Sequence, residues 1–416
     1  MIYRNILDST IQGSRLASRI VALLLGASIL FAARISALQA FADFLASRSL
    51  EGLQRATQLA PANAAFWEAS ALQLPIVSPE YSRDLENALR HDSHNSRLWM
   101  KLGDAAAASG DFHKAEASYL KAAEFNHGYD SHWLLANLYF RSGDTSKFWI
   151  QMREALTFDS RDLGAAFELC WAVTRNPGEI LNAIPKTPRI LARYLEFLIG
   201  ANRMNDAATV ANLLLSAPTG PRREEAPVLL SYCDRLLEAK RYKDASQIWT
   251  AMTRQSLVSG SAGASNVLVN GGMLEPFTGR GFDWRWEAPG NVGHIQIPSL
   301  NQAEFQFDGN QPENCNLLTQ NLALVSGGAY RFTFDYRSLD ITGHSGLRWK
   351  LTDVDTGEIQ VSEEMASLGW KGSVMLFRVP PLSKGQRLVL YYERPRGTTR
   401  ISGSLAVRTL VLRKVD

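Results

Sequence analysis

The chain has little cysteine and no arrangement of side chains typical of a metal site. Three of its 416 residues are cysteines, Cys170, Cys233 and Cys315, and they form no CxxC pair. No histidine or cysteine stands at metal-ligand spacing, so we expect no zinc site, no disulfide framework and no cofactor. A Cys170–Cys233 bridge stays open as an alternative to two buried free thiols. We favour the thiols because cysteine packs well as a small hydrophobic side chain.

A surplus of charge of one sign is also missing. The 44 Lys and Arg residues face 41 Asp and Glu, which leaves a net charge of +3. Proteins that neutralise many phosphates are far more basic, so nucleic acid is not an expected partner. With 46% hydrophobic and 20% charged residues, the composition excludes general disorder and allows two or three globular units.

Catalytic motifs are absent as well. The sequence has no HExxH, nucleophile elbow, phosphate loop or dinucleotide fingerprint. The pairs Asp353/Asp355 and Glu363/Glu364 are conceivable glycosidase carboxylates. The first pair flanks a turn glycine and the second belongs to a charged loop, so we interpret both as solvated residues. We predict a non-catalytic protein without catalytic residues.

Against this background one long apolar run stands out, at residues 20–33 between Arg19 and Arg34. With snorkelling arginines it predicts a transmembrane anchor over residues 16–43. The residues before it carry Arg4, Arg15 and Arg19 against Asp8. The positive-inside rule then predicts a single-pass protein of the cytoplasmic (inner) membrane, with tail 1–15 in the cytoplasm and the bulk of the chain outside it.

Two alternatives compete with the anchor. A cleaved signal peptide fits loosely, because Ala40-Phe41-Ala42 precedes Asp43. A buried amphipathic helix would need a polar face, which the apolar run lacks. We favour the uncleaved anchor, because residues 35–60 keep a helical composition without a break.

A repeat follows, since Trp99, Trp133 and Phe167 lie 34 residues apart. The first copy contains Leu102-Gly103, a Gly110-Asp111 turn and then Ala115, Tyr119 and Ala122. It resembles the tetratricopeptide repeat, in which small residues let paired helices approach and large ones fill the space between them. The second copy keeps Gly143-Asp144 but has Trp149 where a small residue is expected.

The resemblance implies an α-solenoid of about six helical hairpins over residues 44–258. Further pairs are predicted downstream, with turns at residues 200–205 and 240–241. We expect most tryptophans here to be interhelix core, namely Trp67, Trp99, Trp133, Trp171 and Trp249. Arrays of this kind hold a peptide or a helix of another protein, so we expect a protein partner.

The composition changes at residues 259–265, a small flexible linker, and 19 of the 30 glycines lie beyond residue 258. Apolar side chains then alternate with period two, which predicts an antiparallel β-sandwich over residues 266–416. The alternating sets are Phe305/Phe307, Tyr330/Phe332/Phe334/Tyr336, Leu347/Trp349/Leu351, Leu388/Leu390/Tyr392 and Leu405/Val407. The fold class is therefore multidomain α plus β.

The start of this region, Asn266 to Glu275 with Asn270-Gly271-Gly272 and then Trp284 and Trp286, looks like jelly-roll carbohydrate-binding modules. Residues 320–334 resemble their central hairpin, and residues 401–415 their final strand. The resemblance implies a jelly roll that binds polysaccharide. In that family an acidic residue at the position of Glu275 can belong to a calcium site, but one carboxylate makes no site, so no metal is assigned.

Sugars stack on exposed aromatic rings. Trp284, Trp286 and Trp370 lie in Gly- and charge-rich stretches and are our glycan-binding candidates, whereas Trp349 alternates inside a strand. Alternatively, each plugs an end of the sandwich. We thus predict a membrane-anchored scaffold for protein partners and polysaccharide, in envelope or exopolysaccharide assembly or export. The rival hypothesis is a pure protein scaffold without glycan binding.

Overall fold

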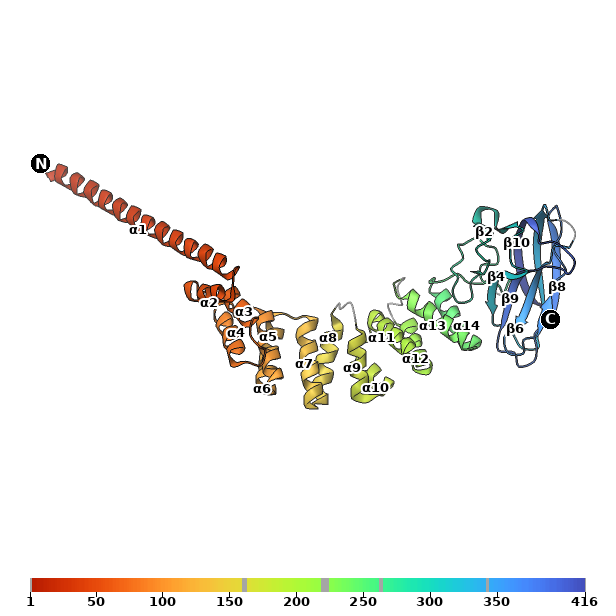
Figure 1. Cartoon of the computed structure of the whole chain (residues 1–416), viewed down its shortest axis with the longest axis horizontal. Coiled ribbons are helices and arrows are strands. Elements are labelled where there is room, and N and C mark those ends of the chain that lie inside the picture. Colours follow the sequence, from red (N-terminus) through yellow and green to blue (C-terminus); the bar gives the residue numbers. More distant parts are fainter. Residues whose placement is uncertain (1, 159–162, 218–223, 262–264, 342–343, 416) are drawn as a thin grey trace. The chain divides into compact units, whose positions relative to one another are not determined.

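The computed structural model describes residues 2–158, 163–217, 224–261, 265–341 and 344–415; the side chains of residues 2–20 and 50 lie outside this description. The chain divides into two compact units, Met1–Arg175 and Asn176–Asp416, and each is described by itself (Figure 1). Most of the predicted linker, residues 262–264, lies outside the described residues, as do the side chains of Arg4, Arg15 and Arg19.

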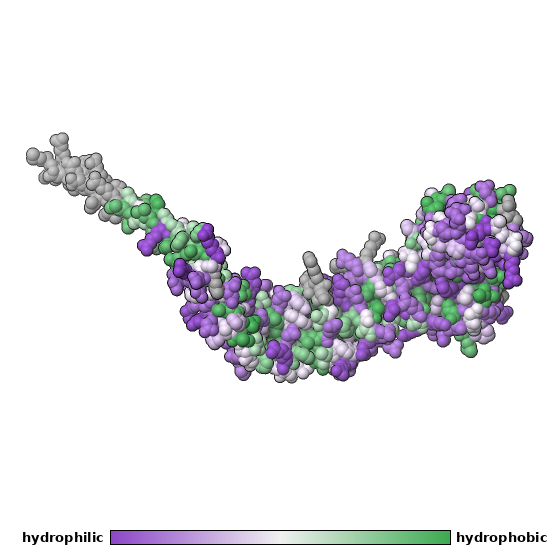
Figure 2. Space-filling view, in the orientation of Figure 1, coloured by the Kyte–Doolittle hydropathy of each residue, from purple (hydrophilic) through white to green (hydrophobic). Residues whose placement is uncertain are grey.

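From Val21 onward, helix α1 (Ile2–Ala46) presents mainly apolar side chains to its surroundings. Its part Val21–Ala46 has 26 residues, and its most apolar window of 18 residues has a mean hydropathy of 2.1 and is not buried. Figure 2 shows hydrophobic residues next to the grey end of this helix, with hydrophilic patches further along it. At about 1.5 Å per residue it spans about 39 Å, more than the hydrocarbon core of a bilayer. The helix is long enough for a single-pass anchor or a signal sequence, and the buried-helix alternative is wrong.

Helical hairpins make up the rest of the first unit. After α2 (Leu50–Leu59) the chain forms three packed pairs and a further helix, α9 (Gly164–Thr174). The pairs are α3 (Ala64–Ala71) with α4 (Pro79–His91), α5 (Ser96–Ala108) with α6 (Phe112–Phe125), and α7 (Tyr129–Ser142) with α8 (Thr145–Thr157). The helix predicted to run unbroken from residue 35 to 60 instead ends at Ala46, and Ser49 caps the next one.

The two repeat copies begin their second helices in the same way. Asp111 accepts a hydrogen bond from the Lys114 amide and Asp144 from the Lys147 amide, both at 3.0 Å. Each aspartate thereby satisfies one of the free amides at a helix start. The glycine before each aspartate has positive φ, 81° at Gly110 and 76° at Gly143. The Gly-Asp pairs in the sequence are therefore helix-stop and helix-start signals.

Small residues set the distance between paired helices, as predicted. A Cβ atom on Gly103 would lie 2.4 Å from Cε1 of Tyr119. Tyr119 is 3% exposed, and its hydroxyl donates to Asp104 Oδ1 at 2.7 Å. Burial, followed by this hydrogen bond, raises the pKa of Tyr119. Because Gly103 has no Cβ atom, it leaves the space that the Tyr119 ring occupies.

The predicted core tryptophans divide into two kinds. Trp249 is buried. Trp67 and Trp99 are half-buried: their rings pack against a buried cluster that includes Leu85 and Leu98. Their indole nitrogens donate to backbone carbonyls six residues upstream, each at 2.8 Å. Trp133 and Trp171 are half-buried too, so much of this set lies at the edge of the core.

The second unit begins with α10 (Pro177–Ala183) and continues with two packed pairs. These are α11 (Pro188–Gly200) with α12 (Met204–Ser216), and α13 (Ala226–Glu238) with α14 (Tyr242–Arg254). Their turns fall where the sequence predicts them.

All three cysteines are free. Cys170 on α9 and Cys233 on α13 are buried, and burial raises the pKa of each thiol to about 12. Of the two alternatives for this pair, the structure has the buried thiols.

Two antiparallel sheets form the predicted sandwich. One has the order β1-β4-β9-β6-β7 and the other β2-β3-β10-β5-β8. The strands are β1 (Arg285–Trp286), β2 (Val292–Ile297), β3 (Gln302–Asp308), β4 (Asn314–Leu322), β5 (Ala329–Leu339), β6 (Leu347–Asp353), β7 (Ile359–Val361), β8 (Lys371–Arg378), β9 (Gln386–Glu393) and β10 (Ser402–Val415).

The alternating apolar sets of the sequence are the inner faces of this sandwich. Phe305, Phe332, Trp349, Leu390 and Val407 are each at most 1% exposed and belong to one core between the sheets. The hairpin predicted over residues 320–334 is wrong, since β4 pairs with β9 and β5 with β8 and β10. A turn at residues 326–328 carries the chain from one sheet to the other.

Candidate binding sites

Trp284, the first glycan candidate, is not available to a ligand. It is 0% exposed and packs against Trp349 and Phe277 inside the core, with centroids 6.0 and 6.3 Å away. Its amide donates to Asp283, whose pKa burial raises. The expectation of exposure is wrong, because the Trp284 ring belongs to the buried core of the sandwich.

Trp286, the second candidate, lies half-buried at the rim of the core. Its ring contacts Phe277 at 5.1 Å, Phe305 at 5.6 Å and the exposed His294 at 4.7 Å. Phe277 and Phe305 cover much of the ring from within. The three neighbouring rings leave Trp286 only partly exposed to a ligand.

Trp370, the third candidate, lies half-buried immediately before the edge strand β8. Two guanidinium groups lie over its ring, that of Arg408 at 3.9 Å and that of Arg337 at 5.2 Å from the centroid. Its environment is therefore cationic, and the ring is occupied by protein side chains.

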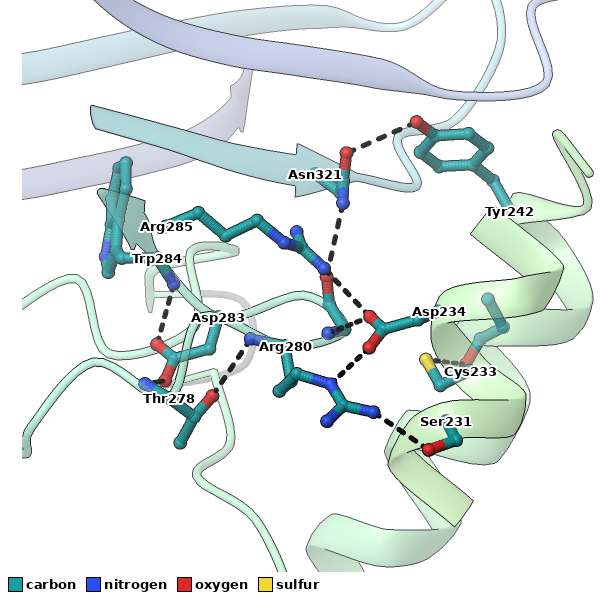
Figure 3. Close-up of polar contacts among 12 residues, drawn as sticks. Ser231, Cys233, Asp234, Tyr242, Thr278, Arg280, Asp283, Trp284, Arg285 and Asn321 are labelled. Carbon is teal, nitrogen blue, oxygen red and sulfur yellow. Dashed lines mark hydrogen bonds and ion pairs between the residues drawn. The ribbon is translucent and has the colours of Figure 1, made fainter. Parts of the chain in front are cut away.

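A site that the sequence did not reveal lies where α13 and α14 meet the sandwich (Figure 3). Asp234 of α13 accepts hydrogen bonds from the Gly281 amide at 2.7 Å and from Arg285 Nη2 at 2.9 Å. It also pairs with Arg280, whose Nη2 donates to Ser231 at 3.0 Å. One carboxylate thus binds two arginines and a backbone amide of the loop that leads into β1.

Aromatic rings of α14 complete this junction. Trp249 and Tyr242 contact Phe282 at 6.0 and 6.5 Å. Glycines make room for them: a Cβ atom would lie 2.2 Å from the Trp249 ring at Gly281 and 2.2 Å from the Tyr242 ring at Gly385. The Tyr242 hydroxyl donates to Asn321 of β4 at 3.3 Å. The last helical hairpin and the sandwich therefore share a small core.

Beside this core lies a pocket of about 370 Å³, within the size range of ligand sites. Its lining combines side chains from α13, α14, β1, β4 and β9, namely Asp234, Leu237, Glu238, Tyr242, Arg285, Asn321 and Arg387. The buried Arg285 Nη1 has no hydrogen-bond partner in the structure. Carboxylate, amide, hydroxyl and guanidinium groups around one cavity suit a ligand rich in hydroxyls.

The first acidic pair builds a turn, but Asp353 is buried and not solvated as predicted. Asp353 Oδ1 accepts from the amides of Asp355 and Thr356, at 3.0 and 2.9 Å. Burial opposes ionisation of Asp353, but hydrogen bonds outweigh it and lower its pKa. Glu364 accepts from the Gly346 amide at 2.7 Å. Among the described residues, no group of three or more His, Cys, Asp and Glu is placed to hold a metal ion.

The junction has no local sequence signal. The sequence gives no reason to distinguish Asp234, Tyr242 and Trp249 from other surface and core positions of two helices. Likewise, it shows Arg280 and Arg285 only as charged residues near a predicted strand. Gly281 and Gly385 resemble many other loop glycines. Only the three-dimensional contacts show that these residues belong together.

No protein-family model matches the sequence, and no curated protein matches it. Among solved structures, the sandwich-containing matches include a CBM4 module, 12% identical, covering 36% of this chain and 99% of the module with a TM-score of 0.28. Another is TmCBM61 in complex with β-1,4-galactotriose, 18% identical, with 32% and 88% coverage and a TM-score of 0.23. Pseudomonas aeruginosa PilF is 16% identical, with 53% and 91% coverage and a TM-score of 0.24.

Proposed function

We propose that this chain is a non-catalytic binding protein, anchored in the cytoplasmic membrane by α1, with its bulk outside the cytoplasm. Its helical array takes a protein partner and its sandwich takes polysaccharide, in envelope or exopolysaccharide assembly or export. The observation that carries the proposal is the junction pocket, because hairpin and sandwich both contribute to its walls. A ligand there would contact both parts at once.

The pocket chemistry supports a sugar ligand. Arg285 lines the pocket, and Glu238 and Arg387 place a carboxylate and a second guanidinium at the same cavity. Sugar hydroxyls donate and accept together, so a lining with both kinds of group can satisfy them. The Arg387 guanidinium is fixed by Glu287 at 2.5 Å, and Glu287 also accepts from Asn316 at 2.9 Å.

The first unit supports the protein-binding half of the proposal. A cavity of about 510 Å³ lies between α4, α5 and α6. Leu89, Trp99, Leu102 and Ala117 give it apolar walls, and charged side chains of Glu86, Arg90, Lys114 and Lys121 surround them. An apolar strip bordered by charges fits the apolar face of an amphipathic helix.

The test is titration of the full chain, in detergent micelles, against a panel of neutral glycans. We expect at least one ligand to bind, and Glu238→Trp to weaken it at least tenfold by filling the pocket. Glu196→Trp is the matched control: Glu238 and Glu196 are 63% and 62% exposed, and each pairs with an arginine three residues earlier. Absence of all glycan binding would favour the pure protein scaffold. If glycan binding is unchanged in Glu238→Trp, the sugar binds at a site other than the junction pocket.

A further inference from the structure

The outer face of the second sheet carries a concentration of arginines. Residues of β5, β8 and β10 alternate between the core and this face, and all residues of these strands are described. The outward positions hold five arginines and a single acidic residue, Asp335. The arginines are Arg331 and Arg337 on β5, Arg378 on β8, and Arg408 and Arg413 on β10. We call these five the arginine face.

Register brings the arginines side by side. Arg413 lies opposite Arg331, and Arg408 lies opposite Asp335. On β5 the set extends over seven residues, from Arg331 to Arg337, which is about 20 Å at strand spacing, and Arg378 lies beyond it, opposite Ala329. The neighbouring strand β3 carries Glu304 and Asp308, so the positive region ends there. Its shape is a strip along the sheet.

At one end of the strip, Trp370 holds two guanidiniums in place. Arg408 lies 3.9 Å and Arg337 5.2 Å from its ring centroid. Stacking on a ring orients a guanidinium and leaves its N–H edge for a planar oxyanion. The Nε atoms of both arginines are buried and make no hydrogen bond; Asp335 lies 3.6 Å from Arg408 Nε, an ion pair outside hydrogen-bonding distance.

Apolar side chains lie between the two ends of the strip. Val374 and Leu376 of the edge strand β8 are 50% and 65% exposed and lie in register with Thr333 and Arg331. A matching ligand therefore alternates apolar surface with anionic groups over some 20 Å. Sugar rings that carry carboxylate or sulfate groups have this character, because their ring faces are apolar and their substituents charged.

We infer that the arginine face binds an acidic polysaccharide, with Arg337 and Arg408, oriented by Trp370, receiving a carboxylate or sulfate of one sugar unit. This inference rests on the proposed role of the sandwich as the glycan-binding part, but it uses a surface other than the junction pocket. The two proposals thus assign neutral glycans to the junction pocket and acidic polysaccharides to the arginine face.

The experiment measures binding of the full chain, in detergent micelles, to polygalacturonate, dextran sulfate and uncharged dextran. We expect the wild-type chain to bind one or both acidic polymers and Arg337→Gln/Arg408→Gln to lose at least tenfold in affinity. Trp370→Ala keeps both charges, and we expect a several-fold loss because the guanidiniums are no longer held. Preference for polygalacturonate identifies a carboxylate ligand, and preference for dextran sulfate a sulfate.

The control for charge is Arg193→Gln/Arg235→Gln, which removes two half-exposed arginines from helices α11 and α13. If the two double variants lose the same affinity, or if Trp370→Ala loses none, binding depends only on the overall charge of the protein. Either result would overturn the inference. Because Glu238→Trp tests only the pocket, failure of one proposal is distinguishable from failure of the other.

Discussion

At the scale of single residues, Gly103 determines how closely α5 and α6 pack. Alanine normally stabilises a helix by about 1 kcal/mol relative to glycine. At this position its Cβ would lie 2.4 Å from the buried Tyr119 ring, and overpacking costs about 1–3 kcal/mol. We expect Gly103→Ala to speed amide hydrogen exchange in α5 and α6 by an amount equivalent to about 1 kcal/mol.

Gly200→Ala provides the comparison, measured on its own hairpin α11/α12. Nothing lies within 4 Å of a Cβ at this position, so exchange should be unchanged or slower. If exchange in α5 and α6 is unaffected by Gly103→Ala, the glycine does not constrain the hairpin.

The buried thiols give a prediction on pH. Burial raises the pKa of Cys170 and Cys233 to about 12, so the reactive thiolate is scarce in the folded protein. We expect iodoacetamide at about pH 8 to spare both in the native chain and to label both in denaturant, where the pKa returns to about 8.5. Rapid native labelling of Cys233, read by mass spectrometry, would contradict the burial.

The same shift affects stability at alkaline pH. The folded pKa lies above the unfolded one, so the stabilising contribution is complete below the unfolded pKa. It is lost as pH rises toward about 12, because the unfolded chain releases its thiol protons first. Cys233→Ala should therefore lose less stability than wild type over this range.

At the scale of elements, Asp234 joins α13 to the loop before β1. Asparagine can still accept from the Gly281 amide, but Arg280 and Arg285 lose their anionic partner. We expect Asp234→Asn to weaken this contact by about 1.5–3 kcal/mol, the usual range for hydrogen bonds to charged groups. The measurement is hydrogen exchange in residues 226–238 and 277–286, which should rise together.

Glu238→Gln, one helical turn away, is the control for this variant. Glu238 pairs with Arg235 at 3.0 Å in an exposed pair, and such pairs contribute less than about 1 kcal/mol. Similar exchange in both variants would mean that the Asp234 contacts do not hold the two elements together.

Helix α1 is the element that decides localisation. With Val21–Ala46 apolar and its window unburied, we expect the full chain to stay in membranes under alkaline extraction and a chain lacking residues 1–46 to be released. The intact mass should include Met1. A soluble chain shortened before Asp43 would instead establish the cleaved signal peptide.

Helices and strands whose apolar residues recur at a regular spacing could be predicted from the sequence. Contacts between residues far apart in the sequence could not. Tyr330, Phe332 and Phe334 alternate, so their strand and its inner face follow from the sequence. The burial of Trp284 could not be predicted from the sequence. The adjacent strand β1 has only two residues, too few for an alternating pattern to show which tryptophan points inward. Asp234 and Arg280 are 46 residues apart, and nothing in either local sequence indicates that they meet.

At the scale of the whole molecule, the boundary predicted at residues 259–265 separates two compositions, and side-chain contacts cross it. Asp234, Tyr242 and Trp249 lie before it, and their partners Gly281, Phe282 and Asn321 lie after it. Cutting there would expose Phe282, which is 6% exposed in the intact chain, and would leave Arg280 and Arg285 without Asp234.

We therefore expect the fragment 265–416 to be less stable than the fragment 224–416, which keeps α13 and α14. Burial of one large apolar side chain contributes about 2 kcal/mol, and about 1 kcal/mol corresponds to about 2–4 °C in Tm for chains of this size. The shorter fragment should thus melt at least about 4 °C lower by calorimetry, with Asp234→Asn in the longer fragment falling between. Equal Tm values would show that the sandwich folds independently of the hairpin, and the shared pocket would then be a contact between two separate domains.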